Sequence, residues 1–408
     1  MRLLYVTADL PWPLTSGYLR HYHFIRALSE RHEITLLSLR GPDHEPGDIE
    51  ALRPYVEAIV TEPSARGPRS LPVKVADRVR MLVAGGDVAA ARLGAAGARI
   101  ADERPFDALL LSGKRTMPVL DGLPPMPLVA DLCDATSSRI RRQMRHASVS
   151  SQPALALEYL EVRRVERALM HRSRHALFAS ARDREALVGR KGEGRPGLAE
   201  ASVVPNGVDL EVWRREGRTL GRDEIVLTGA MDYPPNMDAA EQLVHAILPR
   251  VQAELPAARV SIVGRDPAPG VRALADRPGV TVTGYVDDVR PYLERAAVFA
   301  APIRYGAGIQ NKVLEALAME VPVVASPLAA EGLRTERGNL PPVDVARDAD
   351  GMAALIVTRL RLAAEGASAE PALRAYVAEH FDWGRNAARL GEILEDAAAR
   401  GTPESRRR

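Results

Sequence analysis

One stretch, residues 296–326, limits most strongly how this chain can fold. An apolar run, AAVFAAPI, leads into a turn bracketed by Gly306 and Gly308. From about Ile309 the apolar side chains follow helical spacing until Pro322, and another apolar run begins there. A strand, a glycine turn, a helix and a second strand in this order predict a βαβ unit, which requires a parallel sheet.

The same alternation of short apolar runs and helical segments fills the chain twice. Strand-like runs begin with RLLYVTA (2–8) and recur up to residue 205, and the pattern restarts with EIVLTG (224–229). We therefore expect an α/β protein with two Rossmann-like parallel-sheet domains that face each other across a cleft. The expected bounds are 1–205 for the first domain, 206–222 for the linker, 223–384 for the second domain, 385–400 for a C-terminal helix that can pack back on the first domain, and 401–408 for a disordered tail.

Composition excludes several classes of protein. Cys133 is the only cysteine, so neither an intrachain disulfide nor a cysteine zinc site can form. A net charge of +2 argues against a nucleic-acid partner, and no apolar run reaches the ~18 residues of a membrane span. We expect a cytoplasmic protein, monomeric or homodimeric. Peripheral contact with the inner membrane face, or with an anionic acceptor, stays open because of four neighbouring arginines, Arg139, Arg141, Arg142 and Arg145.

Lysine is rare in this arginine-rich chain. It occurs only at Lys74, Lys114, Lys191 and Lys312. Lys312 follows the glycine turn, where the backbone N–H groups of a helix start favour an anion. Glu315 lies one turn further on, within reach of sugar hydroxyls. The plainer alternative is a packing turn in an α/β sheet.

Six segments, in their order along the chain, resemble the family 4 retaining glycosyltransferases of the GT-B fold (group 1 glycosyltransferases). They are PWPLTSGYLR (11–20), VPNGVD (204–209), LTGAMDYPPNMD (227–238), SIVG (261–264), VTGYVD (282–287) and GAGIQNKVLEALAMEVPVVAS (306–326). The resemblance implies transfer of a sugar from a nucleotide-diphosphate-sugar to an acceptor hydroxyl of a secondary metabolite, a lipid-linked saccharide or a polysaccharide. It also implies retention of the anomeric configuration, with no metal and no cofactor.

The resemblance gives roles to residues that follow strand ends. Lys312, Glu315 and Gly17 are the expected catalytic residues, with Lys312 at the diphosphate and Glu315 at the ribose. Arg20 and Asp134 are the expected acceptor contacts. The expected donor-binding residues are Gly229, Asn236, Gly264, Arg265, Gly284, Tyr285, Val286, Arg304, Gly306, Gly308, Ile309, Gln310 and Asn311.

The chain departs from the family pattern in three places. The family often has two glutamates separated by seven residues; Glu315 matches the second, and Ala307 stands where the first would be. The usual Arg…Lys pair is replaced by MDYPPN (231–236), which leaves Lys312 with Arg304 or Arg265 for the diphosphate. Where many members have His-Asp, this chain has Cys133-Asp134.

Two other functions remain open on the sequence. The segment GAGIQN lacks one glycine of the dinucleotide fingerprint, and Glu331 lies where a ribose-binding acid is expected, so an NAD(P)-dependent oxidoreductase is one alternative. A non-catalytic nucleotide-sugar binder is the other, because Ala307 and Cys133 replace residues that are often functional.

Overall fold

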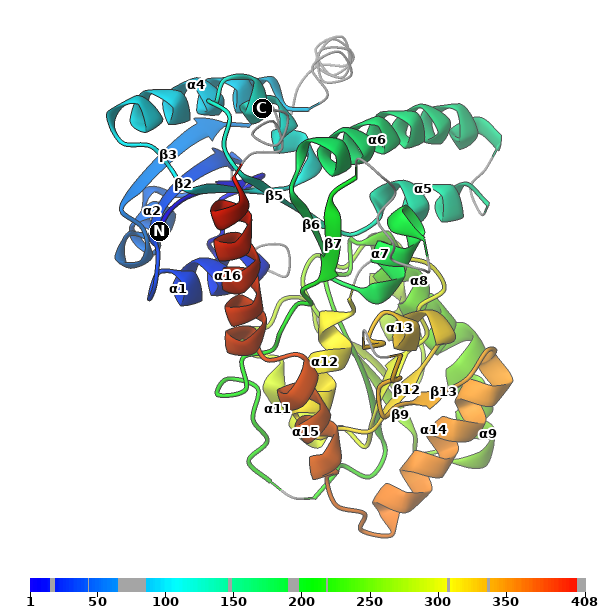
Figure 1. Cartoon of the computed structure of the whole chain (residues 1–408). Helices are drawn as coiled ribbons and strands as arrows, with labels where there is room; N and C mark the ends of the chain where they lie inside the picture. The colour runs from blue at the N-terminus through cyan, green and yellow to red at the C-terminus, as the bar shows by residue number, and fades with distance from the viewer. Residues whose placement is uncertain are drawn as a thin grey trace. The chain divides into compact units, whose positions relative to one another are not determined.

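The computed structural model describes residues 1–14, 19–42, 44–64, 86–145, 149–189, 198–217, 219–306, 309–335 and 338–401. The chain forms two compact units, Met1–Pro205 with Trp383–Arg408, and Asn206–Asp382. Each unit has its own parallel sheet, and we describe each by itself (Figure 1).

The sheet of the first unit has seven parallel strands in the order β3-β2-β1-β4-β5-β6-β7. Several of its strands are continuous apolar runs and are buried along their whole length, as expected for strands covered on both faces. The strand order reverses between β1 and β4, which makes this the switch point where such sheets bind ligands. The strands are β1 (Arg2–Thr7), β2 (Glu33–Arg40), β3 (Ala58–Pro63), β4 (Ala108–Ser112), β5 (Leu128–Cys133), β6 (His175–Phe178) and β7 (Glu200–Val203).

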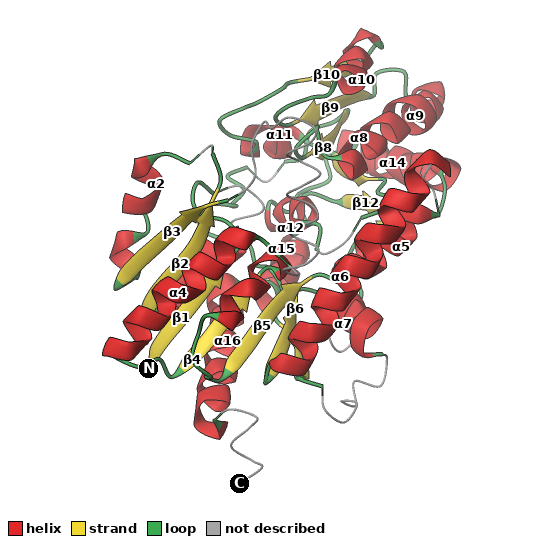
Figure 2. Ribbon diagram, turned by 90° about the horizontal axis from the view of Figure 1, so that it is seen from above, coloured by secondary structure: helices red, strands yellow, loops and turns green. Residues whose placement is uncertain are grey.

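Helices cover both faces of this sheet, and two separate apolar cores result (Figure 2). One core contains side chains from α4 and α6, and the other contains side chains from α1 and the C-terminal helix α16. Trp383, the first residue of α16, stacks on His23 at a ring distance of 4.6 Å and meets Phe24 edge-on at 5.7 Å. The helices are α1 (Leu19–Leu28), α2 (Pro46–Glu50), α4 (Val88–Glu103), α5 (Thr136–Met144), α6 (Gln152–Arg172), α7 (Ala181–Val188) and α16 (Trp383–Arg400).

The sheet of the second unit has six parallel strands in the order β10-β9-β8-β11-β12-β13. Its strand order reverses between β8 and β11, so the expected ligand edge lies where these two strands end. The strands are β8 (Glu224–Thr228), β9 (Arg259–Val263), β10 (Val280–Val282), β11 (Val298–Ala301), β12 (Val323–Ala325) and β13 (Asp344–Val345). The helices are α8 (Pro234–Glu241), α9 (Leu248–Glu254), α10 (Pro269–Arg272), α11 (Arg290–Arg295), α12 (Asn311–Ala318), α13 (Pro327–Glu331), α14 (Ala349–Ala364) and α15 (Pro371–His380).

Two helical segments of this unit have irregular starts or turns. A π-helical turn, Gln242–Ile247, separates α8 from α9 just before Pro249. Proline lacks the N–H that would continue the α-helical ladder, and the wider turn accommodates it. The helix expected from about Ile309 begins at Asn311, because Gln310 has a non-helical backbone (φ −87°, ψ 86°).

No helix in the described part of the chain is long and apolar enough to cross a membrane.

Candidate functional site

The ends of β8 and β9 come together so closely that only glycine fits. Gly229 and Gly264 follow the two strands with φ angles of +146° and +154°, which side chains rarely adopt. A Cβ on Gly264 would lie 1.7 Å from the carbonyl oxygen of Gly229, and a Cβ on Gly229 would lie 2.6 Å from Nδ2 of Asn236. The two glycines therefore allow the ends of β8 and β9 and the side chain of Asn236 to approach one another closely at this edge of the sheet.

Lys312 points to this edge from the first turn of α12. It is only 9% exposed, and its Nζ donates a hydrogen bond to Oδ1 of Asn236. Asn236 is fixed in turn, because its Nδ2 donates to the carbonyl oxygen of Ala230 at 2.9 Å. A Cβ placed on Gly229 would come within 3.5 Å of the Lys312 Nζ. The structure thus brings together three residues that the sequence analysis assigned to the donor site.

Burial shifts the pKa of both ionisable groups on α12. It lowers the pKa of Lys312 to about 8, although nearby Glu315 opposes the shift. It raises the pKa of Glu315 to about 7, and Lys312 opposes that shift in turn. At neutral pH Lys312 is therefore mainly a cation with little water around it, which is the environment in which a charge acts most strongly on an anion.

The other two candidate cations already have carboxylate partners. Both carboxylate oxygens of Asp238 accept from Arg304, whose Nε lies 2.9 Å from Oδ2. Arg265 donates to Asp266 at 3.0 Å. Both arginines are held in exposed ion pairs in this structure, whereas Lys312 is buried at this edge of the sheet.

The remaining donor-site residues lie on loops around this edge or at the start of α12. Gly284 has φ +71° and precedes Tyr285, which is 71% exposed, and Val286. Asn311 Oδ1 accepts from Asn206 Nδ2 at 3.1 Å, which links the VPNGVD segment to the start of α12. Ile309 and Gln310 precede α12 directly, and Gly306 has φ +149°. Gly17, Gly308 and Ala307 lie outside the described residues.

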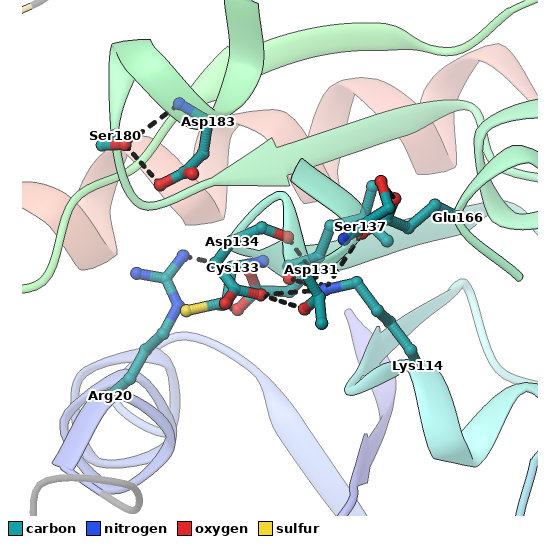
Figure 3. Close-up of polar contacts among 11 residues, drawn as sticks. Arg20, Lys114, Asp131, Cys133, Asp134, Ser137, Glu166, Ser180 and Asp183 are labelled. Atoms are coloured by element: carbon teal, nitrogen blue, oxygen red, sulfur yellow. Dashed lines mark hydrogen bonds and ion pairs between the residues drawn. The ribbon is translucent and has the colours of Figure 1, made fainter. Parts of the chain in front are cut away.

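In the first unit, Arg20 is directed inward (Figure 3). Its guanidinium donates to both carboxylate oxygens of Asp131, at 2.7 and 3.1 Å, and to the carbonyl oxygen of Val204 at 2.8 Å. Both side chains of the ion pair are almost fully buried. Arg20 is therefore held in a buried ion pair and not in solvent. Contact with an acceptor remains a prediction for Arg20.

Asp134 stands at the end of β5 and is held by a lysine that the sequence analysis did not assign to the site. Lys114 Nζ donates to Asp134 Oδ1 at 3.0 Å and to the carbonyl oxygens of Leu132 and Asp134, each at 2.8 Å (Figure 3). Thr136 Oγ1 donates to the same carboxylate at 2.6 Å. Burial alone would raise the pKa of Asp134, but Lys114 and Thr136 together lower it. The rarity of lysine and its place directly after β4 were the available signal for Lys114.

Cys133 and His21 complete this edge. Cys133 has a left-handed backbone (φ +59°), and burial raises the pKa of its thiol to about 12, so it is no nucleophile at neutral pH. His21 lies between Tyr5 Oη at 3.1 Å and Ser112 Oγ at 3.2 Å. Burial lowers the pKa of His21 to about 4, so it is neutral. The first unit thus offers a carboxylate and neutral polar groups at its switch point.

No group of three or more histidine, cysteine, aspartate or glutamate side chains suited to a metal ion occurs among the described residues.

Comparison with known proteins identifies the segment that carries the Lys312 edge. Residues 222–361 match the family model described as "Glycosyl transferases group 1". The matched segment contains β8 to β13, so both Lys312 and Glu315 lie within the part of the chain that is similar to these enzymes.

Two curated relatives are similar to about half of the chain. The chain is 31% identical over 229 residues to a phosphatidyl-myo-inositol mannosyltransferase of Mycolicibacterium smegmatis. The aligned region covers 50% of this chain and 54% of that protein. It is 28% identical over 219 residues to a glycogen synthase of Mycobacterium tuberculosis, and the aligned region covers 50% of each chain. The chain thus spans about half the length of the curated relatives it matches.

Solved structures resemble the whole chain. Sucrose-phosphate synthase from Thermosynechococcus elongatus matches with a TM-score of 0.69 at 15% identity, over 98% of this chain and 99% of the other. Anabaena HepE in complex with UDP matches with a TM-score of 0.64 at 14% identity, over 97% and 100%. The two-sheet α/β architecture is the GT-B fold of these glycosyltransferases, and the predicted fold class is confirmed.

Proposed function

We propose that this protein is a glycosyltransferase that moves a sugar from a nucleoside-diphosphate sugar to an acceptor hydroxyl. The observation that carries the proposal is Lys312, a buried cation at the start of α12, placed beside Gly229 at the switch point of a group 1 glycosyltransferase segment. A diphosphate leaving group gains negative charge as the sugar bond breaks. A cation in a dry site stabilises that charge more in the transition state than in the ground state.

UDP-sugars are the first donors to test. Anabaena HepE has been solved with UDP and with UDP-glucose, and it shares the fold of this chain over nearly its whole length. In our proposal Lys312 and the N–H groups at the start of α12 hold the diphosphate. Glu315, one turn along, accepts hydrogen bonds from the ribose hydroxyls, which requires its ionised form.

The proposed reaction retains the configuration at the anomeric carbon and uses no metal ion, as the family resemblance implies. The bond from the anomeric carbon to the phosphate oxygen breaks, and the acceptor oxygen attacks from the same face. The acceptor proton passes to the leaving diphosphate oxygen, so no protein nucleophile takes part. In this scheme Lys312 supplies the positive charge that a metal ion supplies in other transferases.

The acceptor is proposed to bind at the carboxyl edge of the first unit's sheet. Asp134 is held ionised there by Lys114 and keeps part of its side chain exposed, so it can accept a hydrogen bond from an acceptor hydroxyl. Arg20 is engaged with Asp131, and the acceptor contact therefore rests mainly on Asp134.

Calorimetry of UDP, dTDP and NADP⁺ binding, followed by mass spectrometry of products from a panel of UDP-sugars and acceptors, tests the proposal. We expect tight binding of a nucleoside diphosphate and mass gain of one sugar on an acceptor, with the donor's anomeric configuration kept and no loss of rate in EDTA. Binding of NADP⁺ alone would favour the oxidoreductase alternative. Donor binding without hydrolysis or transfer across the panel would favour a non-catalytic binder.

A further inference from the structure

Helix α6 in the first unit exposes large apolar side chains that no described element covers. Leu160 is 63% exposed and Leu157 is 45% exposed, and Val149, just before the helix, is 88% exposed. Single exposed apolar residues are normal on soluble proteins, but Leu157 and Leu160, three residues apart on α6, are neighbours on the surface of one helix. This grouping of exposed apolar side chains on one helix suggests that they contact a partner.

The exposed residues of α6 form one stripe along the helix. Leu157, Leu160, Arg164 and Arg167 are all exposed and follow one another at spacings of 3, 4 and 3 residues. This spacing keeps side chains on the same side of an α-helix. The opposite side is buried, with Val165 and Leu169 among others in the core of the unit. We call the four residues Leu157, Leu160, Arg164 and Arg167 the α6 stripe.

The charge of the stripe and of its neighbour helix is positive. Helix α5 lies beside α6 (Figures 1 and 2) and contains no acidic residue. Two exposed arginines one turn apart, Arg141 and Arg145, extend from it. Among the described residues, ion pairs and side-chain hydrogen bonds are absent for four arginines, Arg141, Arg145, Arg164 and Arg167. Their charge is therefore available to a partner.

We propose that the α6 stripe, with the arginines of α5, docks on the surface of an anionic lipid bilayer. A helix that joins exposed leucines to unpaired arginines on one face has the two contacts such a surface offers, because the leucines enter the acyl boundary and the arginines meet the lipid phosphates. A nucleic acid would use the arginines but leave the leucines in water. A protein partner would have to bury the leucines and also place acidic groups opposite the arginines, because a buried charge without a partner is costly. This proposal is independent of the proposed transferase activity.

Co-sedimentation of the full chain with sucrose-loaded vesicles tests the proposal. We expect binding to vesicles of 30% phosphatidylglycerol in phosphatidylcholine, little binding to phosphatidylcholine alone, and weaker binding as salt rises from about 0.1 to 0.5 M, because screening shortens the reach of the arginine charge. Absence of binding to the anionic vesicles at low salt would overturn the proposal.

Variants separate the contribution of the leucines to vesicle binding from that of the arginines. Leu157→Ser with Leu160→Ser should lower the partition coefficient roughly tenfold or more. Arg164→Gln with Arg167→Gln should lower it roughly fivefold per arginine. Leu362→Ser is the matched control, because Leu362 on α14 of the second unit is 44% exposed, and it should bind vesicles as the wild type does.

The same variants distinguish membrane docking from misfolding, self-association and nucleic-acid binding. All substituted side chains are exposed, so thermal unfolding should stay within about 2 °C of the wild type. Wild-type binding by both double variants would contradict the assignment of the surface. A dimer in light scattering that only the leucine variant dissociates would make the stripe a self-association surface. If a single-stranded RNA 20-mer binds as tightly as the anionic vesicles do, and only the arginine variant weakens that binding, the α6 stripe would be a nucleic-acid site.

Discussion

Replacing Lys312 by methionine is the most direct test of the proposed donor site. Methionine keeps most of the side-chain volume and removes the charge, so the buried position stays filled. The Nζ of Lys312 is buried and is held toward the switch point by Asn236. If this ammonium meets the donor diphosphate, its loss should weaken donor binding and slow transfer without unfolding the protein.

The expected loss is about a thousandfold. Two unit charges about 4 Å apart interact with about 4 kcal/mol at an effective dielectric constant near 20, and 1.4 kcal/mol corresponds to a factor of ten. Removal of one fixed donor to a developing oxyanion costs about 10² to 10³ in kcat in other enzymes, which agrees with this estimate. Folding stability should change little. Burial of the lysine cation costs free energy, and burial of an apolar side chain of similar volume does not.

Calorimetry with UDP and turnover of the preferred donor measure the effect, and thermal unfolding measures stability. Arg272→Met is the matched control, because Arg272 is an exposed cation on α10 of the same unit and should leave both readouts unchanged. UDP binding within threefold of the wild type in Lys312→Met would refute the assignment of Lys312 to the diphosphate. Loss of binding together with a large drop in melting temperature would mean that the residue acts through the fold.

Three further predictions concern the stability of the ligand-free protein. The pKa of Glu315 is raised to about 7, so the folded chain binds a proton more tightly than the unfolded chain does. The free energy of unfolding should therefore fall by up to about 3 kcal/mol as pH rises from about 4.5 to 7. Glu315→Gln should remove that part of the pH profile. Arg20→Met leaves Asp131 buried and unpaired and should cost about 3–5 kcal/mol in urea unfolding, whereas adding Asp131→Leu should recover most of the loss; equal stability of the two variants would contradict the ion-pair argument. Gly264→Ala places a Cβ against the backbone and should give insoluble protein or a fall of more than about 3 kcal/mol, while Gly47→Ala, whose Cβ meets nothing within 4 Å, should stay within about 1 kcal/mol.

Local patterns in the sequence were sufficient for much of the fold and for part of the donor site. The apolar runs predicted parallel strands because buried strands show no alternation, and both sheets are parallel. Glycines after strands, such as Gly229 and Gly264, could be placed at the ligand edge because such edges lie beyond the carboxyl ends of the strands. Lys312 stood out because lysine is so rare in this chain.

Long-range pairing could not be predicted from the sequence. Arg20 and Asp131 are 111 residues apart, and Arg304 and Asp238 are 66 apart. Whether a charged side chain meets an acceptor, solvent or a distant carboxylate depends on which strand ends lie next to each other, and one sequence does not encode that order locally. Lys114 shows the same limit, because its partner Asp134 follows β5, the strand next to β4 in the sheet.

The return of the chain to its first unit has a consequence for biosynthesis. A ribosome makes residues 1–205 first, yet the core of that unit also needs Trp383, Leu390 and Leu394 from α16. Asn206–Asp382 is a continuous segment and has emerged in full before α16 does, so the second unit can fold earlier although it is encoded later. A nascent chain stalled before residue 383 leaves uncovered the apolar face of α1 on which Trp383 packs in the folded protein.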